Sequence, residues 1–133
     1  MDTIITNTKK AGTIHKKIRS ELNDFIEPNM KLIDICKFIE NKIRLYSESN
    51  QINNGIAFPT GVSLNNIAAH WTPIKKSDNT ILTENDVLKI DFGVHYNGCI
   101  VDSAYTWTHK AKYDPLLNAS KENIPYINLN KLS

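Results

Sequence analysis

Apolar residues recur at helical spacing in two segments near the N-terminus. From Lys9 to Ile26 they fall three or four positions apart, which predicts a helix with Thr8 as its N-cap and Glu27-Pro28 at its end. A second helix is predicted from Lys31 to Tyr46, because apolar residues occupy one face and charged residues the other. Both stripes are typical of helices that pack against a core rather than of cofactor-binding sequences.

The residues from Asp86 to Trp107 alternate between apolar and polar on either side of Asn97-Gly98. An Asn-Gly pair between two such runs predicts a β-hairpin with a two-residue turn. With Asn97 and Gly98 as the turn, Tyr96 pairs with Cys99, and this register assigns every side chain to one face of the hairpin. The predicted core face is lined by Leu88, Ile90, Phe92, Val94, Cys99, Val101, Ser103, Tyr105 and Trp107.

The opposite face of this hairpin carries two carboxylates. Asp91 and Asp102 lie on a diagonal between the strands, with Cβ atoms roughly 7 Å apart. Their directly paired neighbours are Ala104 and Gly93, so the pattern predicts open space beside each carboxylate, enough for an ion. The same pattern fits a polar face in water, with Lys89 as a surface partner of Asp91, and for a hairpin alone the wet face is the more common arrangement.

The stretch from Gly55 to Pro73 contains Pro59 and Gly61 among apolar residues. Proline is excluded from central positions of a sheet, and glycine permits sharp bends, so short extended segments joined by constrained turns are predicted. An Asn54-Gly55 pair marks a turn before them. His70 lies between an apolar triplet and Trp71, a setting in which a structural histidine of the core or its rim is more common than a functional one.

Beyond the hairpin, Asp114 and Pro115 predict a helix that ends near Glu122. Residues 123–133 have no clear period and are interpreted as a divergent tail. The 133 residues have the length of a single domain or of part of one, and helices followed by short extended segments and a hairpin place it in the α/β (α+β) class.

Composition excludes several classes of function. The formal net charge is +2 and 23% of residues are charged, with both signs interspersed, so no nucleic-acid partner is indicated. Cys36 and Cys99 lack a CxxC spacing and occupy apolar patterns, as buried reduced thiols do. The sequence begins without a signal peptide and has no apolar run of membrane-spanning length, which predicts a soluble cytoplasmic protein with no membrane partner.

Two longer runs carry a resemblance to a known family. They are Gly55-Ile-Ala-Phe-Pro-Thr-Gly-Val-Ser-Leu-Asn-Asn-Ile-Ala-Ala-His70-Trp-Thr-Pro and Leu88-Lys-Ile-Asp91-Phe-Gly-Val-His-Tyr-Asn-Gly-Cys-Ile-Val-Asp102-Ser-Ala. Together with both helices and Lys112-Tyr-Asp-Pro-Leu-Leu, they make residues 9 to 122 closely resemble the type 2 methionine aminopeptidases. The resemblance implies the N-terminal half of the pita-bread fold, in which two similar α/β halves enclose two metal ions.

The resemblance also assigns roles by position. Asp91 and Asp102 match the two aspartate metal ligands of the family, and Asp102 corresponds to the carboxylate that bridges both ions. His70 matches a catalytic histidine that contacts substrate, and Phe58 resembles part of the wall of the methionine pocket. The implied cofactors are two divalent ions (Co, Mn, Zn or Fe), which suit carboxylate ligands and can polarise a scissile carbonyl.

The implied activity is removal of the initiator methionine from nascent polypeptides in the cytoplasm, with ribosome association as a further expectation. The family's remaining ligands, a histidine and two glutamates, have no counterpart in this sequence. We therefore expect residues 1–133 to form an incomplete domain, a truncated chain or half of a split protein, which binds metal weakly and does not turn over alone. The alternatives are a non-catalytic pita-bread relative that binds ribosomes, nucleic acid or proteins, and an inactive half with an exposed apolar surface. The retained Asp91, Asp102 and His70 favour the enzyme.

Overall fold

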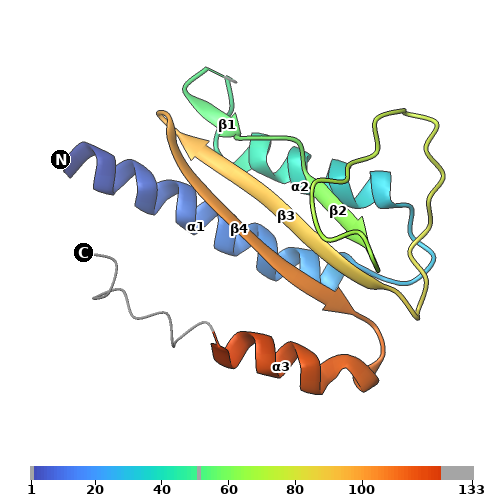
Figure 1. The fold of residues 1–133 in the computed structure, drawn as a ribbon. Coiled ribbons are helices and arrows are strands. Elements are labelled where there is room, and N and C mark those ends of the chain that lie inside the picture. The colour runs from blue at the N-terminus through green and yellow to red at the C-terminus, as the bar shows by residue number, and fades with distance from the viewer. Residues whose placement is uncertain (1, 51, 124–133) are drawn as a thin grey trace.

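The computed structural model describes residues 2–50 and 52–123 of the chain. In that part of the chain, helices cover a small antiparallel sheet (Figure 1), so the prediction of an α+β fold is confirmed. The elements in chain order are α1 (Asp2–Phe25), α2 (Leu32–Tyr46), β1 (Asn54–Ile56), β2 (Gly61–Leu64), β3 (Val87–Tyr96), β4 (Cys99–Thr108), the 3₁₀ helix η1 (Ala111–Tyr113) and α3 (Asp114–Asn123).

β3 is the central strand of the sheet. It pairs along its whole length with β4, and its other edge pairs with β2 near its start and with β1 near its end, all antiparallel. The predicted hairpin register is confirmed, because Tyr96 pairs with Cys99 and Gly93 pairs with Asp102. Asn97 and Gly98 have φ angles of 49° and 79°, the positive values that a type I′ turn requires.

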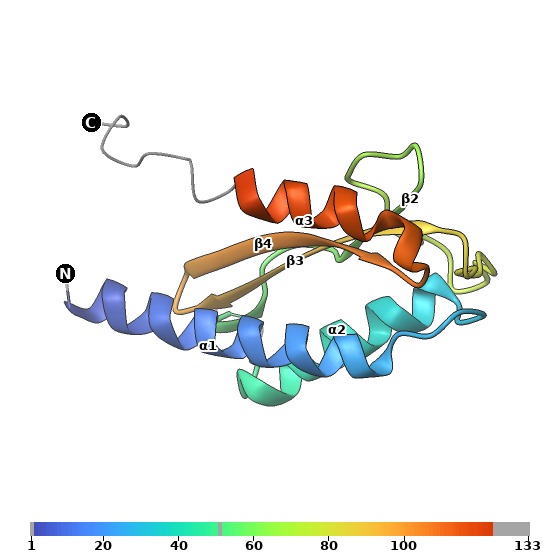
Figure 2. The same cartoon turned by 90° about the horizontal axis from the view of Figure 1, so that it is seen from below.

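The core lies between the sheet and the two long helices. Figure 2 shows α1 and α2 on one side of the sheet, with α3 beyond β4 on the other side. Alternate residues of β3 reach the helices, as the period of two predicts. The fully buried apolar side chains of these elements are Ala11, Ile18, Leu22, Leu32, Ile35, Ile39, Ile43, Val62, Leu88, Ile90, Phe92 and Val94.

The start of α1 differs from the prediction. The helix begins at Asp2, seven residues before Lys9, and Thr8 is not its N-cap, because the Thr8 hydroxyl donates to the carbonyl of Ile4 inside the helix at 2.8 Å. The added turns contain Asn7, which is buried and whose Oδ1 accepts a hydrogen bond from Asn97 Nδ2 at 3.4 Å. This contact with the hairpin turn is one that helical periodicity cannot reveal.

Two smaller predictions are also wrong. The Asn54-Gly55 pair does not form a turn but begins strand β1, in which Gly55 pairs with His95. Cys99 is half-buried rather than buried, although Cys36 is buried as expected and both thiols are free. Most of the predicted tail, residues 124–133, lies outside the described residues.

Candidate metal site

Asp91 and Asp102 project from adjacent strands onto the face of the sheet that α1 and α2 leave uncovered. The two side chains are close enough to interact directly, and the pKa of Asp91 is raised first by burial and then by the hydrogen bond and negative charge of Asp102. The charge of His70 acts in the opposite direction and lowers the pKa of Asp91. On this face, therefore, the negative charge of Asp102 disfavours ionisation of Asp91, and the positive charge of His70 favours it.

The buried oxygen of Asp91 tests whether a metal ion fits here. Asp91 Oδ1 is buried, and no hydrogen-bond donor reaches it within the described residues. A buried carboxylate oxygen without a donor is unfavourable unless a cation or a proton compensates it. Two such hard oxygen donors from neighbouring strands form the kind of ligand set that divalent ions prefer, so the residues present fit a metal.

The alternative of a wet polar face with a lysine partner holds in part. Asp102 is exposed to solvent, as a wet face requires, whereas Asp91 is half-buried. Lys89 lies on the same face as Asp91, but its ammonium group donates to the carbonyl of Asn65 at 2.6 Å. Strand β2 and the residues after it cover this part of β3, since Gly61 pairs with Asp91 and Trp71 in turn hydrogen-bonds to β2. Asp91 is consequently half-buried, and no lysine of residues 2–50 and 52–123 forms an ion pair with it.

A hollow of about 430 Å³ lies in front of the two carboxylates. The four residues that the sequence placed in a site all line it, although they come from three separate segments of the chain. The complete lining is Phe58, Pro59, Gly61, His70, Thr72, Asp91 and Asp102. The structure therefore brings the candidate residues together, and the role of each stays a prediction.

The aromatic wall of this hollow depends on the absence of a side chain at Gly93. A Cβ atom placed there would lie 2.4 Å from Cε1 of Phe58 and 2.9 Å from Cβ of Ala57. The Phe58 ring thus packs over Gly93 and occupies part of the space beside Asp102, while the hollow in front of the two carboxylates stays open. The amide of Ala57 donates to the Gly93 carbonyl at 3.0 Å and fixes the segment that carries the ring.

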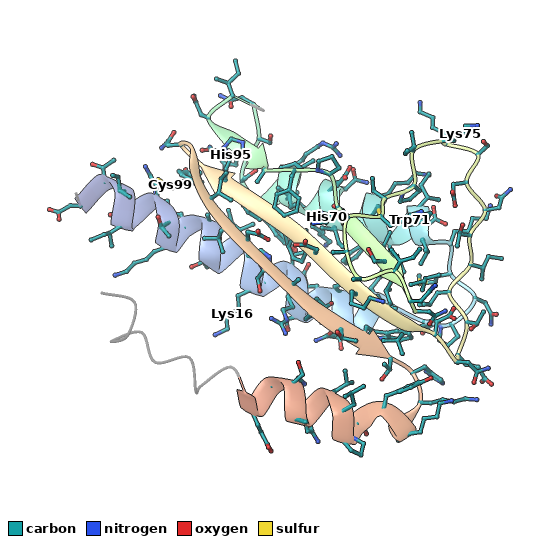
Figure 3. All side chains as sticks on the ribbon, in the orientation of Figure 1. Lys16, His70, Trp71, Lys75, His95 and Cys99 are labelled. Atoms are coloured by element: carbon teal, nitrogen blue, oxygen red, sulfur yellow. The ribbon has the colours of Figure 1, made fainter. Side chains whose placement is uncertain are left out.

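His70 lies at the rim of the hollow with an exposed side chain, close to β2 (Figure 3). Its φ angle of 65° is in the left-handed region, which is uncommon for a residue with a side chain. The next residue holds it there, because the amide of Trp71 donates to Ser63 Oγ at 3.2 Å and its carbonyl accepts from Val62 at 2.8 Å. A backbone held in such a conformation beside two carboxylates is the kind of outlier that suggests a functional position.

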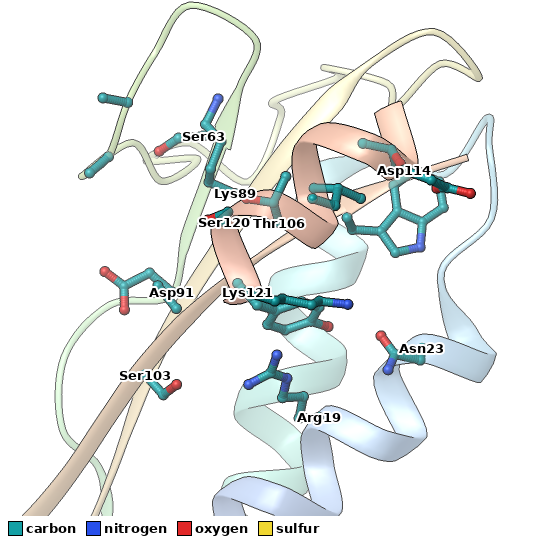
Figure 4. A pocket seen from close by; sticks show the side chains of 17 residues that line it. Arg19, Asn23, Ser63, Lys89, Asp91, Ser103, Thr106, Asp114, Ser120 and Lys121 are labelled. Atoms are coloured by element: carbon teal, nitrogen blue, oxygen red, sulfur yellow. The ribbon is translucent and has the colours of Figure 1, made fainter. Parts of the chain in front are cut away.

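A second hollow of about 470 Å³ adjoins the first at Asp91. Figure 4 shows Asp91 and Ser103 on one side of it and Arg19 with Asn23 on another. The Arg19 guanidinium lies 4.4 Å from the centroid of the Tyr105 ring, and burial raises the pKa of Tyr105 to about 12. The space beside the carboxylates therefore continues between α1, β4 and α3.

The sequence analysis did not single out His15, a buried residue behind the site. It occupies the apolar stripe of α1, where only 4% of it is exposed, and Nε2 donates to the Phe92 carbonyl at 2.9 Å. The rings of His15 and Phe92 are stacked, with centroids 3.9 Å apart and planes inclined by 2°. The sequence feature that could have indicated His15 is its position in a helical stripe of otherwise apolar residues.

Burial of His15 predicts a loss of stability in mild acid. Burial lowers the pKa of His15 from its ordinary value of 6.5, more than the Phe92 hydrogen bond raises it, and the charge of Arg19 lowers it further. As the pH falls below 6.5, unfolded His15 takes up a proton that the native ring resists, so the free energy of unfolding decreases until the lowered pKa is reached. The slope is at most about 1.4 kcal/mol per pH unit for one proton.

Urea titrations between about pH 7.5 and pH 5 measure this effect, with the non-titrating His15→Gln variant as the control. The slope is expected to be steeper for the wild type than for the variant. Equal slopes in the two proteins would show that His15 does not resist protonation.

Neither a larger cluster of metal-binding side chains nor a helix able to span a membrane occurs in residues 2–50 and 52–123. No group of three or more His, Cys, Asp or Glu side chains there could hold a metal ion. No helix in the same residues combines the length and apolar content needed to cross a bilayer. Within the described residues, Asp91 and Asp102 are therefore only part of the ligand set that a metal ion needs.

Known proteins resemble this chain along most of its length. The model of metallopeptidase family M24 matches residues 6–127. Methionine aminopeptidase 2A of Arabidopsis thaliana is 44% identical over 119 residues, which are 90% of this chain and 27% of that protein. Methionine aminopeptidase 2 of Debaryomyces hansenii is 47% identical over 115 residues, which are 86% of this chain and 27% of the relative. The resemblance seen in the sequence is confirmed, and the chain spans about a quarter of the length of these relatives.

The fold is shared with solved structures of more distant proteins. Prolidase from Pyrococcus furiosus superposes with a TM-score of 0.67 at 17% identity, over 84% of this chain and 31% of that protein. At this identity the likeness shows the fold alone. The expected half of the pita-bread fold is confirmed.

Proposed function

The chain belongs to metallopeptidase family M24, and on this premise we propose that it contributes to metal-dependent removal of N-terminal methionine from polypeptides. The observation that carries the proposal is the meeting of Asp91, Asp102, His70 and Phe58 at one hollow. The similarity to proteins named methionine aminopeptidase 2 supports the choice of substrate. Nascent polypeptides, the cytoplasm and association with the ribosome belong to the same proposal.

In this proposal Asp91 and Asp102 hold the metal. The two side chains come from neighbouring strands. When a cation binds, Asp91 Oδ1, which accepts no hydrogen bond within the described residues, becomes one of its ligands. A divalent ion held there supplies Lewis-acid chemistry for cleavage of an amide bond. Two ions, drawn from Co, Mn, Zn and Fe, are proposed for the complete site, with further ligands from outside the described residues.

The other two residues act on the substrate. The Phe58 ring and Pro59 form an apolar wall of the hollow, and a methionine thioether packs favourably against an aromatic ring. His70 lies at the rim with its ring exposed, where it can hydrogen-bond to a peptide or transfer a proton. The pocket thus offers an apolar subsite next to the carboxylates, which suits an N-terminal methionine.

Peptide binding in the presence of Mn²⁺ tests this function. The 133-residue chain is titrated with Mn²⁺ and the tripeptide Met-Ala-Ser, and broadening of the alanine methyl signal, which the comparison peptide Lys-Ala-Ser also has, is recorded by NMR. Broadening is expected with Met-Ala-Ser and not with Lys-Ala-Ser. Phe58→Ala is expected to remove the preference for methionine while Mn²⁺ affinity stays unchanged.

Equal broadening of both peptides, or none, would contradict the proposed substrate. Release of free methionine is measured in the same samples. None is expected, because two carboxylates are an incomplete set of ligands for a two-metal centre. Release at rates usual for enzymes would show that the chain completes its site by itself.

A further inference from the structure

His15 connects α1 to the two strands that carry the carboxylates. Its Nε2 donates to the Phe92 carbonyl at 2.9 Å, and the backbone of Ser103 lies beside the same ring. Phe92 follows Asp91 directly and Ser103 follows Asp102 directly. One buried side chain therefore contacts the backbone next to both candidate ligands.

The register of the hairpin shows where this contact lies relative to the two carboxylates. Phe92 pairs with Ser103, and this pair lies between the pair that contains Asp91 and the pair that contains Asp102. The histidine reaches the middle pair from the helix side of the sheet, while the carboxylates project from the flanking pairs on the other side. Figure 1 shows α1 running along β3 and β4 in this way.

We propose that His15 is a positioning residue, which fixes the Phe92–Ser103 pair against α1 and so sets the spacing of the Asp91 and Asp102 carboxylates. The inference rests on the proposed function as far as it concerns metal. Two neighbouring carboxylates repel each other, and β4, which pairs only with β3, can twist to separate them. A hydrogen bond and a ring stack from a rigid helix resist that motion.

The chemistry of histidine suits this task better than that of an apolar residue. A leucine or phenylalanine at position 15 would fill the same space but could not donate to a carbonyl. Metal sites tolerate deviations of only about 0.2 Å in ligand distance, so small shifts of the strands change the affinity for the metal ion. Substitution of residues that orient metal ligands typically weakens metal binding by about 10- to 100-fold.

Three variants separate positioning from general support of the fold. His15→Phe keeps a flat ring to stack on Phe92 but removes the donor, whereas His15→Gln keeps a donor and removes the ring. Leu22→Ala is the matched control, because Leu22 is fully buried in the same stripe of α1 but none of its hydrogen bonds reaches the hairpin pair. Each variant is measured for Mn²⁺ affinity by calorimetry and for stability by urea titration.

His15→Phe is expected to weaken Mn²⁺ binding by about tenfold, and His15→Gln by less than about threefold. Leu22→Ala is expected to lower the urea midpoint at least as much as His15→Phe and to leave Mn²⁺ affinity unchanged. If Leu22→Ala weakens binding as much as His15→Phe does, or if His15→Phe binds like the wild type, His15 is a structural residue only.

Amide hydrogen exchange of the metal-free chain provides a second readout. His15→Phe is expected to speed exchange of the amides of residues 91–93 and 102–104 more than that of other sheet amides. Leu22→Ala is expected to speed exchange evenly across the sheet. An even change in both variants would overturn the inference. If the wild type binds no Mn²⁺, the proposed function fails, and exchange still decides the role of His15.

Discussion

Asp102→Asn is expected to abolish detectable Mn²⁺ binding and, at the same time, to raise the free energy of unfolding. The carboxylate of Asp102 raises the pKa of Asp91, which burial has already raised, so the two groups oppose each other in the metal-free protein. The asparagine amide removes that repulsion and is nearly equal in size. A small gain in stability at pH 7 is expected, together with a loss of metal affinity of about 100-fold or more.

Calorimetric Mn²⁺ titrations and urea titrations of the same preparations measure the two effects. Asp24→Asn is the matched control, because Asp24 is exposed on α1 and the substitution changes the charge equally. It is expected to alter neither quantity. Unchanged Mn²⁺ affinity in Asp102→Asn would refute the assignment of this carboxylate, and lower stability would show that it has a structural partner.

Gly93→Ala is expected to lower the free energy of unfolding by about 2 to 3 kcal/mol. The added methyl group would lie 2.4 Å from Cε1 of Phe58 and 2.9 Å from Cβ of Ala57, so the segment that carries the ring has to move off β3. The wall of the hollow then shifts away from Asp102, the residue paired with Gly93. Binding of Met-Ala-Ser is therefore expected to weaken along with stability.

The same substitution at Gly12 is the control. A Cβ atom there would meet only Val101 Cγ2 at 3.9 Å, an ordinary contact, and Gly12 lies inside α1. Gly12→Ala is expected to stabilise the chain by up to about 1 kcal/mol, because alanine favours helix more than glycine does. Combining Gly93→Ala with Phe58→Ala is expected to restore part of the lost stability. If Gly93→Ala matches Gly12→Ala in urea titrations, the ring does not lie on the strand.

The sequence predicted the hairpin and the face of each carboxylate because both depend on local rules. An Asn-Gly turn fixes which residues pair, and the period of two then assigns Asp91 and Asp102 to the face away from the core. The amphipathic stripes of α1 and α2 were readable for the same reason, since burial follows the helical period. The metal interpretation came from the resemblance to a family, because a polar face of a hairpin is by itself ambiguous.

The remaining features depend on contacts between distant parts of the chain. The early start of α1 accompanies the hydrogen bond between Asn7 and Asn97, which are 90 positions apart. The Phe58 ring occupies the space at Gly93, although pairing within the hairpin alone left that space open. The proposed role of His15 depends on its hydrogen bond to the Phe92 carbonyl, which is 77 positions away in the sequence. No periodicity along the sequence encodes such contacts.

In the proposed site, Asp91 and Asp102 together bind a divalent cation. Backbone ¹H–¹⁵N spectra of the wild-type chain, recorded during titration with small amounts of Mn²⁺, test it most directly, because the paramagnetic ion broadens the nearest amides first. Broadening is expected to begin at Asp91 and Asp102, to reach His70 next, and to disappear in Asp102→Asn. Broadening that begins at other acidic residues, such as Glu21 or Asp34, or that persists in the variant, would contradict it.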